Sequence, residues 1–276
     1  MKEFMLSYIE RDSPVHRLNG AVKLIVFLLW SILTMAGYDT RIMLVMSVLG
    51  IVLFAISRIR IKDVSFIFKM LLVFMAINLI MIYVFAPQQG VLIYGSSHVL
   101  LEGSGRLSLT FEQLFYEFNV FLKYTMIVPL AILLIVTTKP SEFAASLNKI
   151  GIPYSIAYSV SLALRYIPDI QRDFQNISQA QQARGVELSK KTSLGKRLKG
   201  VSAILLPLIF SSLERIDVIS HAMELRSFGK YKRRTWYAER PFTRFDIIIL
   251  LCAIILFTLG IWFTFHDGNR FWLPCV

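Results

Sequence analysis

The sequence predicts an all-α fold, a polytopic membrane protein with about five transmembrane helices and a cytoplasmic module of long amphipathic helices. The first observation is composition, because 55% of the 276 residues are hydrophobic and the mean hydropathy is +0.59. Soluble domains hold roughly 45 to 50% apolar residues. The second observation is a set of long apolar runs, and the third is an excess of basic residues in one segment. A lipid bilayer is therefore the expected surrounding of most of the chain.

Five apolar runs are candidates for crossing the roughly 30 Å of hydrocarbon in a bilayer. They cover residues 21–36, 42–56, 66–85, 118–137 and 247–265. The first two are slightly short unless flanking residues join them. The runs predict a membrane region with four transmembrane helices over residues 1–137, and a last transmembrane helix with a short external tail over residues 245–276. Residues 86–112 hold several glycines and short apolar stretches such as residues 91–94, which favours an external loop containing a small hairpin.

Basic residues orient these runs, because loops rich in Lys and Arg are retained in the cytoplasm. Between Lys139 and Arg244 there are 18 Lys and Arg residues against 8 Asp and Glu residues, more than half of the 30 basic residues in the chain. We therefore expect residues 138–244 to form a cytoplasmic module. Five spans then place the N-terminus in the cytoplasm as well.

Three helices are predicted in the cytoplasmic module. A short one is interrupted by Gly151 and Pro153. A long one follows from residue 154 to about residue 184, and a second long one extends from about residue 198 to residue 226, with apolar residues at spacings of three and four that mark one face. A basic linker is expected between them. Its basic residues are Lys190, Lys191, Lys196, Arg197 and Lys199.

Both long helices end with the same pattern, I-S-x-A-x-x-x-R, at an offset of 42 residues. The pattern ends at Arg184 in the first helix and at Arg226 in the second, and a small residue, Gly185 or Ser227, follows each arginine. A basic residue near a helix C-terminus is common for electrostatic reasons alone. Two like-ended amphipathic helices in one basic module favour instead two equivalent docking tips for a two-fold symmetric or pseudo-symmetric partner.

Motifs for catalysis, nucleotide binding and metal binding are missing from the sequence. There is no G-x-x-x-x-G-K-[ST] run, no G-x-S-x-G and no H-E-x-x-H, and the four histidines are scattered. Cys252 and Cys275 form no C-x-x-C pair. Among the lysines of the apolar runs, Lys23 and Lys69 lie within one turn of an end and are expected to snorkel. Lys123 is the one for which a functional neighbour stays open as an alternative. We expect no catalytic residue, no cofactor and no metal site.

Four segments together resemble one family over nearly the whole chain. They are Ser13-Pro14-Val15-His16-Arg17-Leu18-Asn19 with Lys23, Lys139-Pro140-Ser141-Glu142-Phe143 through Gly151-Ile152-Pro153, Ala183-Arg184-Gly185, and Ala222-Met223-Glu224-Leu225-Arg226-Ser227-Phe228-Gly229. The chain resembles the transmembrane T component (EcfT/CbiQ-like) of energy-coupling factor transporters, which are ABC-type importers of prokaryotes. It departs from the usual pattern at Gly20-Ala21 and at Leu225.

The resemblance implies a non-catalytic scaffold in the prokaryotic inner or plasma membrane, which couples ATP hydrolysis to uptake of a vitamin or a cobalt or nickel ion. Its implied partners are two ABC-type ATPase subunits, a small membrane S component that binds the substrate, and the lipid bilayer, with no nucleic acid. It also implies that the two long helices are coupling helices whose tips enter the two ATPases. The implied coupling residues are Ala183, Arg184, Gly185, Leu225, Arg226 and Ser227.

Two other functions stay open on the residues alone. Basic clusters at residues 190–199 and 230–234 would suit a membrane anchor for an anionic partner, although cytoplasmic loops near anionic lipid show the same charge. A membrane-embedded enzyme would need polar groups converging inside the apolar runs. The sequence leaves open the identity of the substrate, whether the S component is dedicated or shared, and whether the ATPases are identical.

Overall fold

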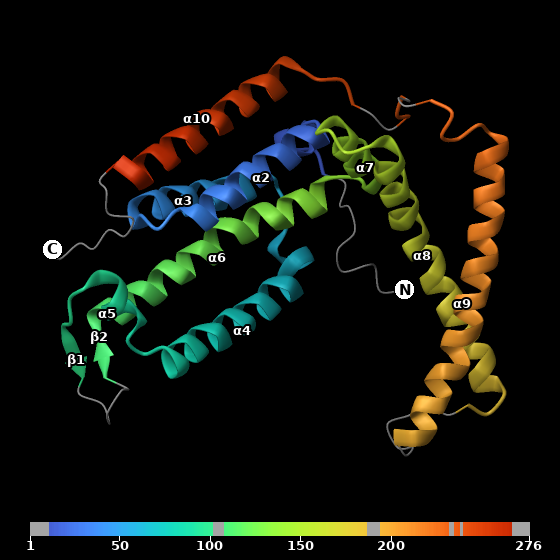
Figure 1. Ribbon diagram of the computed structural model, residues 1–276, viewed down its shortest axis with the longest axis horizontal. Helices are drawn as coiled ribbons and strands as arrows, with labels where there is room; N and C mark the ends of the chain where they lie inside the picture. The colour runs from blue at the N-terminus through green and yellow to red at the C-terminus, as the bar shows by residue number, and fades with distance from the viewer. Residues whose placement is uncertain (1–10, 102–107, 187–193, 232–234, 238–239, 267–276) are drawn as a thin grey trace. The chain divides into compact units, whose positions relative to one another are not determined.

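The computed structural model describes residues 11–101, 108–186, 194–231, 235–237 and 240–266 (Figure 1). Helices dominate these residues, accompanied by one two-stranded antiparallel sheet of β1 (Val99–Leu101) and β2 (Leu109–Thr110). The chain divides into two compact units. One comprises Met1–Lys139 with Arg240–Val276, and the other comprises Pro140–Glu239.

The first unit, which we call the membrane unit, contains a helix at each of the five predicted apolar runs. These helices are α2 (Gly20–Ala36), α3 (Thr40–Ile56), α4 (Ile61–Phe85), α6 (Phe111–Thr137) and α10 (Arg244–His266). Within the described residues, α4, α6 and α10 are long and apolar enough to cross a membrane, and α2 and α3 are shorter apolar helices. The all-α membrane fold predicted from the sequence is confirmed.

Helix α6 forms the centre of the membrane unit and packs against α2, α3 and α4 (Figure 1). Half of its most apolar stretch is buried, whereas the corresponding share is 0% in α4 and 11% in α10. The core is built from Trp30 and Leu33 of α2, Met43 of α3, and Met126 and Leu130 of α6. Because α4 and α10 present large apolar side chains outward, their outer faces suit hydrocarbon as solvent.

The segment before α6 differs from the predicted loop. Residues 91–94 belong to a short helix, α5 (Gln89–Tyr94), the hairpin is formed by β1 and β2, and α6 begins at residue 111 rather than 118. Polar residues at the start of α6 explain the error, because Glu112, Gln113 and Asn119 are buried and hydrogen-bonded. Hydropathy assigns such residues to loops, but here tertiary hydrogen bonds satisfy them inside a helix.

The second unit, which we call the helical module, contains α7 (Pro140–Lys149), α8 (Tyr154–Ala183) and α9 (Leu194–Leu225). The predicted break at Gly151 and Pro153 is confirmed, and Gly151 has φ +105°, which favours glycine. Helix α9 begins at residue 194, earlier than predicted, so residues 196–199 are helical and not part of a linker. Lys and Arg are good helix formers, and for that reason a basic run does not by itself mark a loop.

Candidate functional site

The C-terminus of α8 places Arg184 at a defined, exposed corner. The N–H of Val186 donates to the carbonyl of Gln181 at 3.0 Å, and the N–H of Gly185 donates to that of Gln182, also at 3.0 Å. Gly185 has φ +85°. These bonds form the turn that commonly ends a helix with a left-handed residue. They satisfy carbonyls that would otherwise be unpaired and fix the direction in which the chain leaves the arginine.

The C-terminus of α9 repeats this geometry 42 residues later. The N–H of Phe228 donates to the carbonyl of Met223 at 2.9 Å, and the N–H of Ser227 donates to that of Glu224 at 2.9 Å. Ser227 takes the left-handed position with φ +56°. A serine is strained there, whereas a glycine is not. The sequence repeat thus corresponds to a repeat of backbone structure at both helix ends.

All six residues implied as coupling residues are exposed in the structure. Ala183, Arg184 and Gly185 form one group, which we call the α8 tip, and Leu225, Arg226 and Ser227 form the second, the α9 tip. Leu225 is 88% exposed, an unusual place for a large apolar side chain. Each tip therefore offers a forked guanidinium beside small or apolar surface, which suits docking into a groove of another protein.

Helices α8 and α9 cross within the helical module (Figure 1). At the crossing, Arg215 of α9 donates to a carboxylate oxygen of Asp173 of α8 at 2.5 Å. These two positions are also 42 residues apart, so equivalent positions of the repeat contact each other. In an antiparallel pair of helices, such a contact is the one expected beside a local pseudo-two-fold axis. The two tips are equivalent positions of the same repeat, 42 residues apart.

The two tips lie at opposite ends of the antiparallel pair. The ring of Phe228, just beyond the α9 tip, lies 4.7 Å from the ring of Tyr158 and 5.8 Å from that of Tyr154, both in the first turns of α8. Trp236 joins this cluster at 5.1 Å from Tyr154, and its indole N–H donates to Asn148 at 3.2 Å. Sequence reasoning missed this aromatic cluster. Its signal was the i,i+4 spacing of the two tyrosines.

This aromatic support is specific to the α9 tip. The equivalents of Tyr154, Tyr158 and Phe228 under the 42-residue offset are Lys196, Gly200 and Val186, none of which is aromatic. The repeat therefore holds at the helix ends, in sequence and in backbone structure. It does not extend to the aromatic residues that support the α9 tip.

The residues from Ser13 to Asn19 connect helices of the membrane unit. Ser13 caps the short helix α1 (Pro14–Arg17), and its hydroxyl lies 2.7 Å from the ring of the buried His16. Asn19 caps α2 by accepting from the N–H of Ala21 at 2.9 Å. This segment of the family resemblance is therefore explained by helix capping.

Asp246, a residue that sequence reasoning missed, ties the start of α10 to the start of α2. Its carboxylate is buried and accepts from the N–H of Asn19 at 2.8 Å, from the N–H of Thr243 at 2.8 Å and from the Thr243 hydroxyl at 2.7 Å. The Asn19 side chain donates in turn to the carbonyl of Arg240 at 2.6 Å. The pattern T-x-x-D before an apolar run is the local signal of such a capping box.

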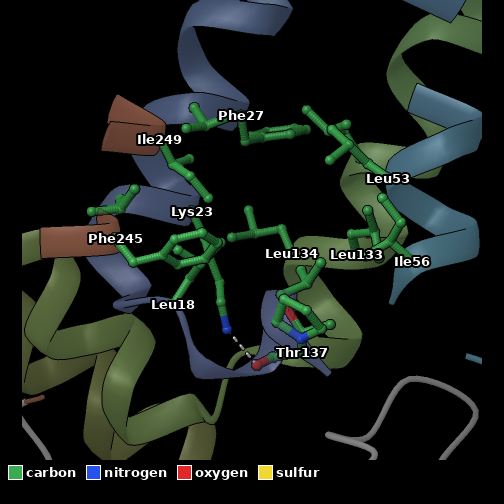
Figure 2. A pocket seen from close by; sticks show the side chains of 15 residues that line it. Leu18, Lys23, Phe27, Leu53, Ile56, Leu133, Leu134, Thr137, Phe245 and Ile249 are labelled. Atoms are coloured by element: carbon green, nitrogen blue, oxygen red, sulfur yellow. Dashed lines mark hydrogen bonds between the residues drawn. The ribbon is translucent and has the colours of Figure 1, made fainter. Parts of the chain in front are cut away.

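Two of the lysines in the apolar runs, Lys23 and Lys123, are held by the protein. Lys23 is 7% exposed, and its amino group donates to the carbonyl of Thr137 at the end of α6 at 2.8 Å (Figure 2). The expectation that Lys23 snorkels to the membrane surface is therefore wrong. A cation near the carbonyl end of a helix is stabilised by the helix dipole. Lys123 faces protein, with its amino group 3.5 Å from the centre of the Tyr38 ring.

Metal ligation has no support in the described part of the chain, where no group of three or more His, Cys, Asp or Glu side chains is placed to hold an ion.

Comparison with known proteins gives consistent relatives. The family model of CbiQ, described as cobalt transport protein, matches residues 11–237. The energy-coupling factor transporter transmembrane protein EcfT of Lactococcus lactis is 26% identical over 265 residues, which cover 91% of this chain and 96% of that protein. The proteins of the same name from Bacillus selenitireducens and Clostridium kluyveri are each 28% identical, over 269 and 274 residues, with 92% of this chain and 94% of theirs covered.

Proposed function

Because the chain belongs to the CbiQ family of cobalt transport proteins, we propose that it is the transmembrane T component of an energy-coupling factor importer. In this role it is a non-catalytic scaffold that joins two ABC-type ATPase subunits to a small S component that binds the substrate. The observation that carries the proposal is the pair of exposed arginine tips, which share backbone geometry and are equivalent positions of the same repeat. A dimer of similar ATPases presents two similar grooves, which such a pair of tips fits.

Each tip would engage one ATPase through its arginine. A guanidinium presents donors in a rigid fork that pairs with carboxylates and carbonyls in two parallel hydrogen bonds. Arg184 and Arg226 would fill this role, and the apolar surface of Leu225 would add contact area at the α9 tip. Because the tips lie at opposite ends of the helix pair, a movement of the two ATPases relative to each other would displace both ends of the pair and rotate it.

The contacts within the helix pair support the transmission of such a movement. The Asp173–Arg215 ion pair holds the two helices at their crossing, and the aromatic cluster ties the end of α9 to the start of α8. Displacement of either tip would therefore move both helices together. The module would pass this movement to the membrane unit through the chain connections after Lys139 and before Arg240.

Within this proposal, residues 1–137 form a membrane region with four spans, residues 138–244 form the cytoplasmic coupling module, and residues 245–276 supply the fifth span. The N-terminus is cytoplasmic, and the loop near residues 86–112 is external. Single cysteines placed at Ser96 and Ser178 of a chain with Cys252 and Cys275 replaced by serine test this orientation. A reagent that does not cross membranes should label the cysteine at residue 96 in intact cells and the one at residue 178 only after lysis.

The coupling role is tested by purifying the tagged chain from its native membrane, identifying its partners by mass spectrometry, and measuring ATP-driven substrate uptake. The double variant Arg184→Ala with Arg226→Ala should lose uptake. Arg172→Ala is the matched control, because Arg172 is an exposed arginine of α8 away from the tip, and it should retain uptake. If no ATPase accompanies the wild-type chain, or if the control loses as much uptake as the double variant, the assignment of the tips is wrong.

The substrate would be a micronutrient, either a vitamin or a transition-metal ion, captured by the S component. The matching family carries the description cobalt transport, whereas the relatives are named for energy coupling alone. Uptake of radiolabelled cobalt and of labelled vitamins, with the copurified S component present, distinguishes the two classes.

A further inference from the structure

An apolar cavity of about 220 Å³ opens at one end of the membrane unit, between α2, α3, α6 and α10 (Figure 2). Figure 2 shows side chains from these helices around the space, among them Phe27, Leu53, Leu134, Phe245 and Ile249. Lys23 lines it with its hydrocarbon stem, because its amino group is bonded to the Thr137 carbonyl. The walls are therefore almost purely hydrocarbon.

A second apolar cavity, of about 210 Å³, continues this space along α2. The two share Val26, Leu53 and Ile249 and together line α2 from Val22 to Leu33. This stretch of α2 is about 16 Å long at about 1.5 Å per residue. One leaflet of a bilayer has about 15 Å of hydrocarbon, half of the roughly 30 Å core. We call the two cavities together the acyl groove, because their combined length along α2 and their apolar lining match a single acyl chain.

The end of the acyl groove adjoins a wider cavity of about 540 Å³, which shares Pro14 and Phe245 with it. We call it the polar mouth, because its other lining residues are charged or polar. Two arginines, Arg17 and Arg58, line this polar mouth together with one acid, Asp12. Arg17 forms an ion pair with Asp12 at 2.8 Å, but both side chains are largely exposed. Such surface ion pairs contribute little to stability, so a phosphate could replace Asp12 as the partner of Arg17. The mouth thus has a net positive charge.

Arg58 is held in a backbone conformation that its side chain does not favour. It follows the end of α3 with φ +57°, the left-handed position at which glycine is usual. Local strain of this kind is characteristic of positions that serve a purpose beyond folding. A glycine there would fit the backbone better.

We propose that the membrane unit holds an anionic phospholipid, with one acyl chain in the acyl groove and the phosphate bound by Arg58 and Arg17 at its mouth. Basic pockets between transmembrane helices are suited to anionic headgroups, and a guanidinium pairs with phosphate through two parallel bonds. A zwitterionic lipid would bring its own cation to a mouth that already carries two. A fatty acid would fill the groove but would leave the wide polar mouth without a phosphate.

Binding can be measured through Trp30, which is buried and lines the acyl groove. The full chain is prepared with phenylalanine at Trp236, Trp262 and Trp272, so that Trp30 is the single tryptophan, and is placed in detergent micelles. Phosphatidylglycerol with a doxyl label on its acyl chain is then titrated, and quenching of Trp30 fluorescence reports occupancy. Unlabelled phosphatidylglycerol, phosphatidylcholine and oleic acid serve as competitors.

Phosphatidylglycerol should compete at least about tenfold better than oleic acid, as expected for one charge-assisted contact to phosphate. It should also compete better than phosphatidylcholine, which keeps the phosphate but brings a choline cation close to the two arginines. Arg58→Gly should weaken phosphatidylglycerol binding by a similar factor without lowering thermal stability, since it removes the guanidinium and relieves the strained φ. The matched control is Arg60→Gly, the same loss of charge two residues away at a position outside the lining of the mouth, and it should bind normally.

A second pair of variants tests the acyl groove. Val26→Phe fills the space shared by the two cavities and should abolish saturable quenching, whereas Val48→Phe, at an exposed site on α3, should not. Equal competition by phosphatidylcholine, or equal loss in Arg58→Gly and Arg60→Gly, would overturn the assignment of the headgroup site. Undiminished quenching in Val26→Phe would overturn the acyl groove itself.

Discussion

Replacement of Asp246 should destabilise the membrane unit more than any change at its outer surface. The buried carboxylate accepts three hydrogen bonds, at 2.8 Å from the N–H of Asn19 and at 2.8 and 2.7 Å from the N–H and hydroxyl of Thr243. Hydrogen bonds to a charged group contribute about 1.5 to 3 kcal/mol each, and they are not additive within one network. Asp246→Ala also leaves the Asn19 N–H buried without its acceptor, so we expect a loss of about 3 kcal/mol.

Thermal unfolding of the detergent-solubilised chain measures this loss. At about 2 °C per kcal/mol for a chain of this size, Asp246→Ala should lower Tm by about 6 °C. Asp246→Asn should cost about half as much, because its oxygen can still accept from Asn19 while its amide cannot accept from Thr243. Asp169→Ala is the control, since Asp169 is 40% exposed and its ion pair with Arg172 is long at 3.8 Å. A shift below 1 °C in Asp246→Ala would refute the argument that this carboxylate ties α10 to α2.

Three further changes test the helix ends, the crossing and the loop. Ser227→Gly should raise the free energy of unfolding by about 0.5 kcal/mol, the strain relieved less the entropy of glycine, and a Tm that falls would contradict the strain. Arg215→Ala should cost about 0.5 to 1 kcal/mol, and a double-mutant cycle with Asp173→Ala should assign most of it to their pairing, which is a third exposed. Gly90→Ala should cost about 2 kcal/mol, because its Cβ would lie 2.3 Å from the Glu112 carbonyl oxygen; an unchanged Tm would show that the loop yields.

Periodicity and hydropathy predicted the helices well where the buried residues are apolar and the exposed residues of loops are polar. The five apolar runs and the break at Gly151 depend on local composition, and local composition is what hydropathy measures. The start of α6 could not be predicted in this way. Glu112 is fully buried, and its carboxylate accepts hydrogen bonds from the N–H of His98 and the hydroxyl of Ser96 across the loop. These contacts produce no periodic pattern in the sequence, so hydropathy could not predict them.

In the candidate site, too, features that depend on local sequence could be predicted, whereas features that depend on distant contacts could not. The repeat that ends in Arg184 and Arg226 is visible in the sequence because each copy encodes a local helix end. The aromatic support of the α9 tip and the contacts of Asp246 with Asn19 join residues far apart in the chain, so only the fold reveals them.

The 42-residue offset relates residues at the crossing of α8 and α9 as well as at their C-terminal ends. A duplicated motif can arise from two helices that never meet, each ending in the same way for local reasons. Here the offset also relates Asp173 to Arg215, and these two side chains contact each other. In an antiparallel pair, a contact between a position and its own equivalent is the one that a local two-fold axis through the crossing would give. The 42-residue offset therefore relates two contacting residues of the folded helix pair as well as the two helix ends.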